Sequence, residues 1–443
     1  MATNAPVPDS GPSAPVETSR AEPPAIPAPG DTGGIFGRFT LLFGAEVACR
    51  AMRFLADIVL VRHFGQSAYG QLNVAQSLTV QGTWVATCGL NTAGVRSVAA
   101  RQESAATIAA TVVVLRCLLA ALTWGIVCAI AWVVPPYRDS LQLTALYSLS
   151  LFTGALNIAW AAQGRGDVRP LGIGMLAVHI VYVAGVQVVT AFDWPLIFVP
   201  LILVGAEVVT AVGVWLWVVH GIGRVARPLP LADALRFFRE ALPIGGAALL
   251  RGMLPGTDVL LLGLFLDKAR VGQYSAAMKL YSLGFVILAA WFAILLPQLS
   301  RRAAESMAQV RDAVSTGIRQ TLLAGVPVIA AGLLLGPAVL RLLFGPGFDD
   351  AAPVLRLLLL VLPLQLLSGH GRMALVALGR QRYDLGLVAV SSAVHVAAKL
   401  ALIPALGMMG AAWGTFTGEA ALVLLTWYAT RTVFREGEDR GRV

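Results

Sequence analysis

Four charged residues lie close together in an apolar stretch near the start of the chain: Glu46, Arg50, Arg53 and Asp57. Their spacing predicts that all four share one face of a helix, within an arc of about 60°. We call them the charged stripe. One interpretation is purely structural, with two i,i+4 ion pairs, Glu46–Arg50 and Arg53–Asp57. The other is an anion site in which the carboxylates hold the arginines until a phosphate arrives, since a guanidinium donates two parallel hydrogen bonds to phosphate.

A sparser copy of the stripe occurs in the second half of the chain. Arg251 and Asp258 align with Arg50 and Asp57 at an offset of 201 residues. We expect Asp258 to hold Arg251, and we add Lys279 to the candidate substrate-binding residues. A protein with such an internal repeat can bind its substrate between the two copies.

Several other polar residues lie within apolar stretches. Asn73 and Gln76 could bind the hydroxyl groups of a sugar, although amides also join membrane helices to one another. Lys399 and Glu419 are predicted to form an interhelical pair. Glu419 is either a structural, hydrogen-bonded carboxyl or a coupling group. Arg116 either reaches the membrane interface or lines a cavity.

The segments that position these residues are hydrophobic. Apolar residues make up 57% of the 443 residues and charged residues 13%, against about 25% in soluble domains. Twelve apolar blocks exceed the about 20 residues that cross a bilayer as helix. The predicted spans are about 35–61, 71–94, 107–134, 141–162, 171–191, 195–219, 242–266, 274–297, 317–344, 353–378, 383–404 and 407–430. A charge facing lipid costs roughly 2.5–3.5 kcal/mol, so the stripe must face protein or water.

The order of the segments predicts the organisation of an all-α membrane protein with a parallel repeat. Arginines are far more numerous in the loops after even-numbered spans, which places these loops and both termini in the cytoplasm. Six spans per copy insert both copies in the same sense. The predicted segments are a disordered Pro-rich cytoplasmic tail (1–34), a first lobe (35–219), an amphipathic cytoplasmic linker helix (220–241), a second lobe (242–430) and a charged cytoplasmic tail (431–443).

Motifs for enzymatic chemistry are missing from the sequence. It has no H-E-x-x-H, no Walker A loop and no G-x-S-x-G, so we expect a transporter without catalytic residues, cofactor or metal. The four cysteines form no C-x-x-C pair. The basic residues are scattered through short loops rather than gathered in a patch, so we expect no nucleic-acid partner.

Several segments, in order along residues 35–430, resemble the polysaccharide-transporter branch of the multidrug/oligosaccharidyl-lipid/polysaccharide exporter superfamily, the oligosaccharide flippases. The matching segments are VLVRHFGQSAYGQLNVAQSL, VGQYSAAMKL, ILLPQLSRR, LLFGPGFDDAAPVLRLL, ALGRQRYD and LIPALGMMGAAWGT. The resemblance implies two six-helix lobes around a central cavity and alternating access. It also implies that Arg50, Arg53 and Arg251 bind the pyrophosphate of an undecaprenyl-linked oligosaccharide.

The family resemblance further implies a bacterial cytoplasmic (inner) membrane protein in polysaccharide synthesis, driven by an ion gradient or the membrane potential. Its partners would be the lipid-linked oligosaccharide, membrane lipids, a polymerase and glycosyltransferases. The main alternative is a cation-coupled multidrug exporter of the same superfamily, which would have an acidic, aromatic cavity. A membrane polymerase or ligase would need a large outward loop, and a scaffold would have all its buried charges paired.

Overall fold

The computed structural model describes residues 32–100, 104–222, 227–252 and 256–440, and all secondary structure in these ranges is helical. Almost all of the predicted N-terminal tail and the last three residues lie outside the described ranges. The predicted segment boundaries therefore remain predictions at both ends of the chain.

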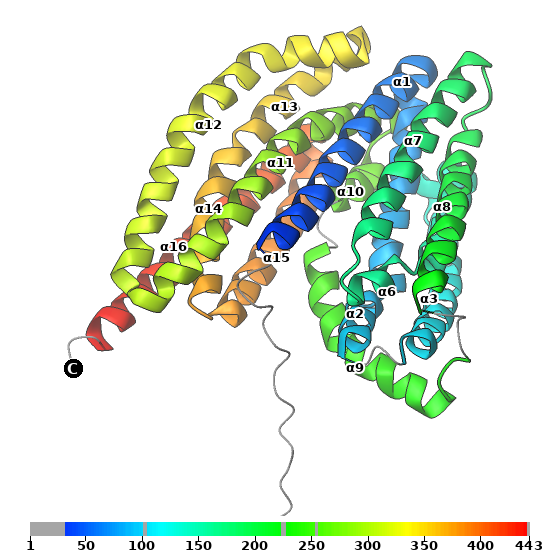
Figure 1. Ribbon diagram of the computed structural model, residues 1–443. Coiled ribbons are helices and arrows are strands. Elements are labelled where there is room, and N and C mark those ends of the chain that lie inside the picture. Colours follow the sequence, from blue (N-terminus) through cyan, green and yellow to red (C-terminus); the bar gives the residue numbers. More distant parts are fainter. Residues whose placement is uncertain (1–31, 101–103, 223–226, 253–255, 441–443) are drawn as a thin grey trace, which may run out of the picture.

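The first half of the chain forms a bundle that we call the first lobe (Figure 1). Its elements are α1 (Thr32–Thr87), α2 (Leu90–Ala100), α3 (Ala105–Val133), η2 (Pro135–Ser140), α4 (Leu141–Tyr147), α5 (Ser150–Leu156), α6 (Ala159–Gly164), α7 (Arg169–Ala191) and α8 (Phe198–Ile222). The predicted fourth span is thus divided into short helices.

The second half forms the second lobe. Its elements are α10 (Thr257–Phe265), α11 (Lys268–Glu305), α12 (Met307–Phe344), η3 (Pro346–Ala351), α13 (Ala352–Leu359), α14 (Val361–Ala377), α15 (Gln381–Leu406) and α16 (Met408–Arg440). Local sequence explains two of the helix starts, because Asp267 and Ser306 cap α11 and α12 by accepting hydrogen bonds from the backbone amides of Arg270 and Gln309.

Helix α9 (Leu231–Gly252) connects the lobes. It runs from the predicted linker through Pro243 into the segment predicted as the seventh span. It packs on α2 and α1 of the first lobe. Its exposed side includes Leu231, which is 75% exposed, and Leu235.

The chain is a multi-pass membrane protein. Eight helical segments of the described residues are long and apolar enough to cross a membrane. Helix α1 contains the first predicted span and most of the second as two arms joined at Gly65, whose φ of +80° breaks the regular helix and favours glycine. The two arms run in opposite directions (Figure 1).

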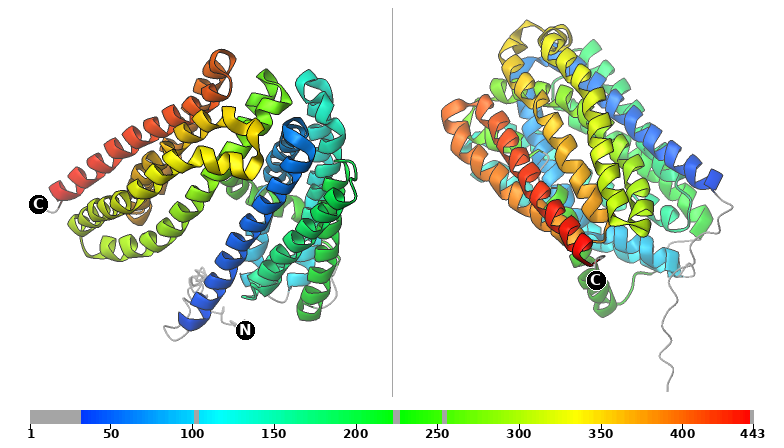
Figure 2. Two further views of the ribbon diagram at one scale, coloured as in Figure 1. Left: turned by 90° about the horizontal axis from the view of Figure 1, so that it is seen from above. Right: turned by 90° about the vertical axis from the view of Figure 1, so that its left-hand side faces the viewer.

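The two lobes meet at the end of the molecule where α1 bends and spread apart toward the end where α16 finishes (Figures 1 and 2). Helix α1 is the shared element, since it packs on α7 of its own lobe and on α11 of the other. The largest hydrophobic cluster draws on both lobes, including Leu60, Leu72, Leu262, Tyr274 and Phe344. Burial of these side chains holds the lobes together.

The end at which the lobes meet is also joined by polar contacts, and we call it the closed end. The Gln66 side chain donates to the carbonyl of Gly347 over 2.6 Å and accepts from Gln273 over 3.0 Å. A Cβ on Gly70 would lie 1.8 Å from the carbonyl oxygen of Lys268. Only glycine permits this backbone approach.

Candidate functional site: the charged stripe between the lobes

The first arm of α1 carries the charged stripe on a face separate from its exposed apolar face. The exposed side chains of Leu41 and Leu55 lie on roughly the opposite side of the helix from the stripe, by the 100° turn per residue. The charged residues therefore do not lie on the apolar side of the helix, which is the side suited to face lipid.

Exposure along the stripe falls toward the closed end. The side chains of Glu46 and Arg50 are 42% and 47% exposed, and the predicted pair between them is present, with Arg50 Nε 2.8 Å from Glu46 Oε1. Arg53 is half-buried. Asp57 is 2% exposed. The stripe thus extends from an accessible beginning into the core between the lobes.

The predicted Arg53–Asp57 pair is wrong. Asp57 Oδ2 instead lies 2.6 Å from Nζ of Lys279, which α11 supplies from the other lobe. The order of charges explains the difference, because an acid four residues before a base pairs better on a helix than the reverse order. Glu46–Arg50 has the favourable order and Arg53–Asp57 the unfavourable one.

Arg53 is consequently left without a carboxylate. Among the described residues, no carboxylate oxygen lies within 4.0 Å of its guanidinium nitrogens. Asp57, one turn further along α1, and Glu207 of the first lobe act on its charge only from farther away. A half-buried guanidinium without a close counterion is suited to binding an anion.

Asn73 and Gln76 are buried within the first lobe. Both are at least nine-tenths buried. Asn73 donates to the carbonyl of Tyr69 over 2.7 Å, and Gln76 donates to the hydroxyl of Tyr147 over 2.9 Å. These bonds explain their presence without a substrate, so direct sugar binding by these two residues stays a prediction.

Asp258, the repeat counterpart of Asp57, lies in a fully buried cluster within the second lobe. It pairs with Lys399 of α15 and accepts a 2.6 Å hydrogen bond from the hydroxyl of Tyr274 and a 3.4 Å bond from Thr415. Both carboxylate oxygens are used. The side chain of Arg251 lies outside the described residues, so the predicted contact between Arg251 and Asp258 stays a prediction.

The predicted Lys399–Glu419 pair is also wrong, because Lys399 contacts Asp258. Glu419 Oε1 accepts a 3.3 Å hydrogen bond from Gln365, while its Oε2 is buried without a hydrogen-bond partner in the described part of the chain. The choice of partner depends on how α15 packs against α10, which sequence spacing does not reveal.

Tyr147 and Tyr274 form buried polar contacts that were not predicted from the sequence. Each is almost fully buried and hydrogen-bonded to a polar side chain. A tyrosine within a long apolar block could have indicated them, since a buried hydroxyl requires a hydrogen-bond partner.

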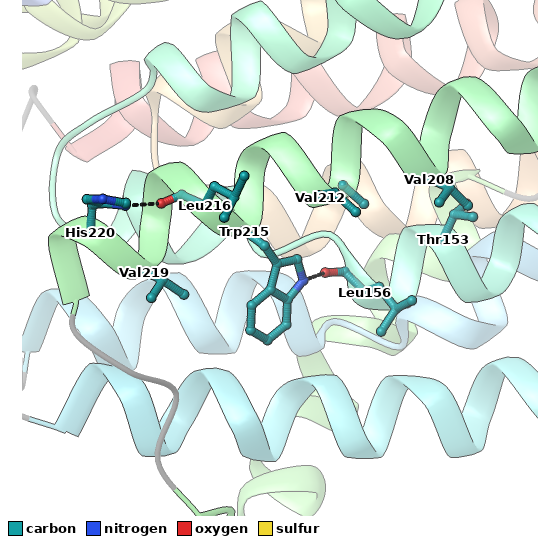
Figure 3. Close-up of a pocket in the computed structure, with 9 residues that line it drawn as sticks. Thr153, Leu156, Val208, Val212, Trp215, Leu216, Val219 and His220 are labelled. Atoms are coloured by element: carbon teal, nitrogen blue, oxygen red, sulfur yellow. Dashed lines mark hydrogen bonds between the residues drawn. The ribbon is translucent and has the colours of Figure 1, made fainter.

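A cavity of about 380 Å³ lies elsewhere in the first lobe, between α5 and α8 (Figure 3). Its lining is almost wholly apolar, and the Trp215 indole donates to the carbonyl of Leu156 over 2.6 Å. No residue of the charged stripe contributes to it. The cavity is therefore not a candidate for recognising a charged group.

Two family profiles match this chain. The profile of the polysaccharide biosynthesis protein family matches residues 38–303, which is well over half of the chain. The profile of the lipid II flippase MurJ matches residues 260–439. The probable low-salt glycan biosynthesis flippase Agl15 of Haloferax volcanii is 24% identical over 159 residues, covering 36% of this chain and 34% of that protein. The match thus spans about a third of the length of that relative.

Solved structures with the same fold include two transporters. An inward-facing multidrug resistance MATE family transporter of the MOP superfamily has a TM-score of 0.71 at 15% identity, covering 88% of this chain and 96% of that one. The lipid II flippase MurJ in an inward closed conformation has a TM-score of 0.73 at 13% identity, covering 88% and 87%. At this identity the likeness establishes the fold.

Proposed function

This chain belongs to the polysaccharide biosynthesis protein family, and on that premise we propose that it is a flippase for a lipid-linked glycan. The proposed substrate is an oligosaccharide on an undecaprenyl pyrophosphate-type carrier, moved from the cytoplasmic to the outer leaflet. The observation that carries the proposal is the pairing of Asp57 with Lys279 across the lobes, which leaves Arg53 beside them without a close carboxylate.

The pyrophosphate would bind to Arg53 first. Its planar guanidinium can donate two hydrogen bonds to one phosphate. Arg50, four-tenths or more exposed and held by Glu46, would turn from its carboxylate toward the second phosphate. Arg251 remains a candidate because it aligns with Arg50 in the repeat.

Lys279 couples binding to movement in this proposal. Its ammonium is a flexible point charge, and its side chain is 26% exposed. A phosphate bound at Arg53 would compete with Asp57 for Lys279. Loss of the Asp57–Lys279 pair would weaken the junction between the lobes and favour opening of the closed end, which is the requirement for alternating access.

The cellular setting is proposed from the family and the loop charges. We place the protein in the bacterial inner membrane with both termini cytoplasmic, because the loops after even-numbered spans are rich in arginine. Glycosyltransferases would supply the substrate and a polymerase would consume it. An ion gradient or the membrane potential would drive transport.

A flipping assay tests the proposal. The full chain is reconstituted in vesicles with a labelled oligosaccharide on undecaprenyl pyrophosphate, and a membrane-impermeant reagent reports the leaflet of the label. The wild type should move the lipid, and Arg53→Ala should slow it by on the order of tenfold or more. Arg341→Ala, at an exposed position of α12, is the control. Unchanged flipping by a folded Arg50→Ala, Arg53→Ala double variant would remove the mechanism.

A cation-coupled exporter of small molecules is the second candidate. The observation that favours it is Glu207 on α8, a partly buried carboxylate whose hydrogen-bond partner is the neutral hydroxyl of Thr153. Such a group can exchange a proton or cation during transport. Increased drug susceptibility of a deletion strain, with normal surface polysaccharide, would favour the exporter over the flippase.

A further inference from the structure

A second pocket, with several polar residues in its lining, lies in the first lobe, and no residue of α1 lines it. It has a volume of about 400 Å³ and is formed where α2, α3, the α5–α6 connection and α7 meet. The polar residues that line it are Asn91, Thr92, Arg116, Asn157 and Gln163, together with the indole of Trp160. A pocket with this lining differs sharply from the apolar cavity between α5 and α8.

Arg116 is a buried cation without a close anion. Its residue is 6% exposed. One terminal nitrogen, Nη1, reaches the carbonyl of Asn157 only at 3.5 Å, and Nε is buried with no hydrogen-bond partner. No carboxylate of the described residues lies within 4.0 Å of the guanidinium. A buried charge is unfavourable unless an opposite charge compensates it.

Two more polar groups around the same pocket are buried and unsatisfied. They are Nε1 of Trp160, an obligate donor, and Oδ1 of Asn91. The Asn91 amide can be turned to present its NH2 instead, since the two orientations fit a similar space. Buried polar groups are normally hydrogen-bonded. The uncompensated charge of Arg116 beside this pocket therefore indicates an anionic ligand, and the Trp160 indole adds a second group that can only donate.

We propose that this pocket binds a phosphate-type oxyanion, with Arg116 as its charged anchor and Trp160 as a second donor. A tetrahedral oxyanion offers several acceptors, and a guanidinium binds it through two parallel hydrogen bonds. The phosphate could belong to an anionic phospholipid headgroup or to a soluble phosphate or diphosphate. The site goes beyond the proposed function, because it is separate from the charged stripe and its occupancy can be measured without transport.

The experiment uses the full chain in nanodiscs and has two arms. In nanodiscs of phosphatidylcholine alone, inorganic phosphate and pyrophosphate are titrated by calorimetry. In nanodiscs that also contain phosphatidylglycerol, native mass spectrometry counts the retained anionic lipid. Wild type should bind one equivalent in at least one arm, and Arg116→Gln should weaken that binding by on the order of tenfold or more. Binding only in the first arm identifies a soluble phosphate, and binding only in the second a headgroup.

Two further variants keep the test valid if Arg116→Gln does not fold. Gly154→Leu retains the arginine but fills the pocket, because a Cβ at this position lies 3.8 Å from Arg116 Nη2. It should reduce binding as Arg116→Gln does. Arg319→Gln, an exposed arginine of the second lobe, is the matched control and should bind like the wild type. The proposal is overturned if wild type binds no probe in either arm, or if both pocket variants bind as well as the wild type.

Discussion

Asp57 Oδ2 and Lys279 Nζ lie 2.6 Å apart and join the two lobes through residues that are 222 positions apart in the chain. The carboxylate is almost fully buried and the ammonium is partly exposed. This asymmetry leaves the lysine accessible to a competing anion while the aspartate stays in the core. Asp258, the repeat counterpart of Asp57, pairs instead with Lys399 of its own lobe.

The cross-lobe pair should contribute measurably to stability. Removing one member leaves the other uncompensated, which costs about 3–5 kcal/mol for a fully buried pair. We expect a loss near the lower end for Asp57→Asn or Lys279→Gln, because Lys279 is 26% exposed. Thermal unfolding of the single and double variants measures the coupling. The double variant should lose less stability than the sum of the single variants, and additive losses would contradict the pairing.

The buried Asp258–Lys399 pair should be more costly to break than the cross-lobe pair. Both residues are at most 6% exposed, so Lys399→Gln leaves a carboxylate with no access to water and should cost about 3–5 kcal/mol. Thermal unfolding of Lys399→Gln beside Lys279→Gln makes the comparison, since both variants carry the same substitution. An equal or smaller loss at Lys399 would show that burial does not set the cost here.

The geometry of Arg53, and not only its charge, should matter for transport. Arg53→Lys keeps the charge but loses the planar fork, so we expect flipping to slow by on the order of tenfold. Arg50→Lys should have a smaller effect, because Arg50 already pairs with Glu46. Initial flipping rates at equal protein density measure both. Rates for Arg53→Lys equal to the wild type would mean that a point charge suffices.

A side chain at Gly70 should open the closed end. A Cβ there would lie 1.8 Å from the Lys268 carbonyl oxygen and 3.1 Å from the Gly272 nitrogen, so Gly70→Val must separate the backbones of α1 and α11. Cysteines placed at Gln66 and Gln273, whose side chains are in contact, report the closed end by cross-linking. The native cysteines are first replaced to remove background reactions.

Cross-linking between positions 66 and 273 should be efficient in the parent chain and much reduced with Gly70→Val. Gly44→Val, on the same helix, is the matched control because a Cβ there meets nothing within 4 Å. It should leave cross-linking unchanged. Equal cross-linking with and without Gly70→Val would show that the close approach of the two backbones does not hold this end closed.

Features that depend on residues near one another in the chain were predictable from the sequence. Twelve apolar blocks predicted a helical membrane protein, and the spacing of Glu46, Arg50, Arg53 and Asp57 predicted one charged face. The Glu46–Arg50 pair was also predictable, because residues four apart on a helix meet whatever the rest of the chain does.

The partners of the buried charges, in contrast, depend on how the helices pack against one another. Asp57 pairs with Lys279 and Asp258 with Lys399, because the packing of α1 on α11 and of α10 on α15 brings these side chains together. Arg116 likewise acquires its pocket from four separate segments. The partner of a buried charge is set by helix packing. Spacing along one helix carries no information about a helix more than a hundred residues away.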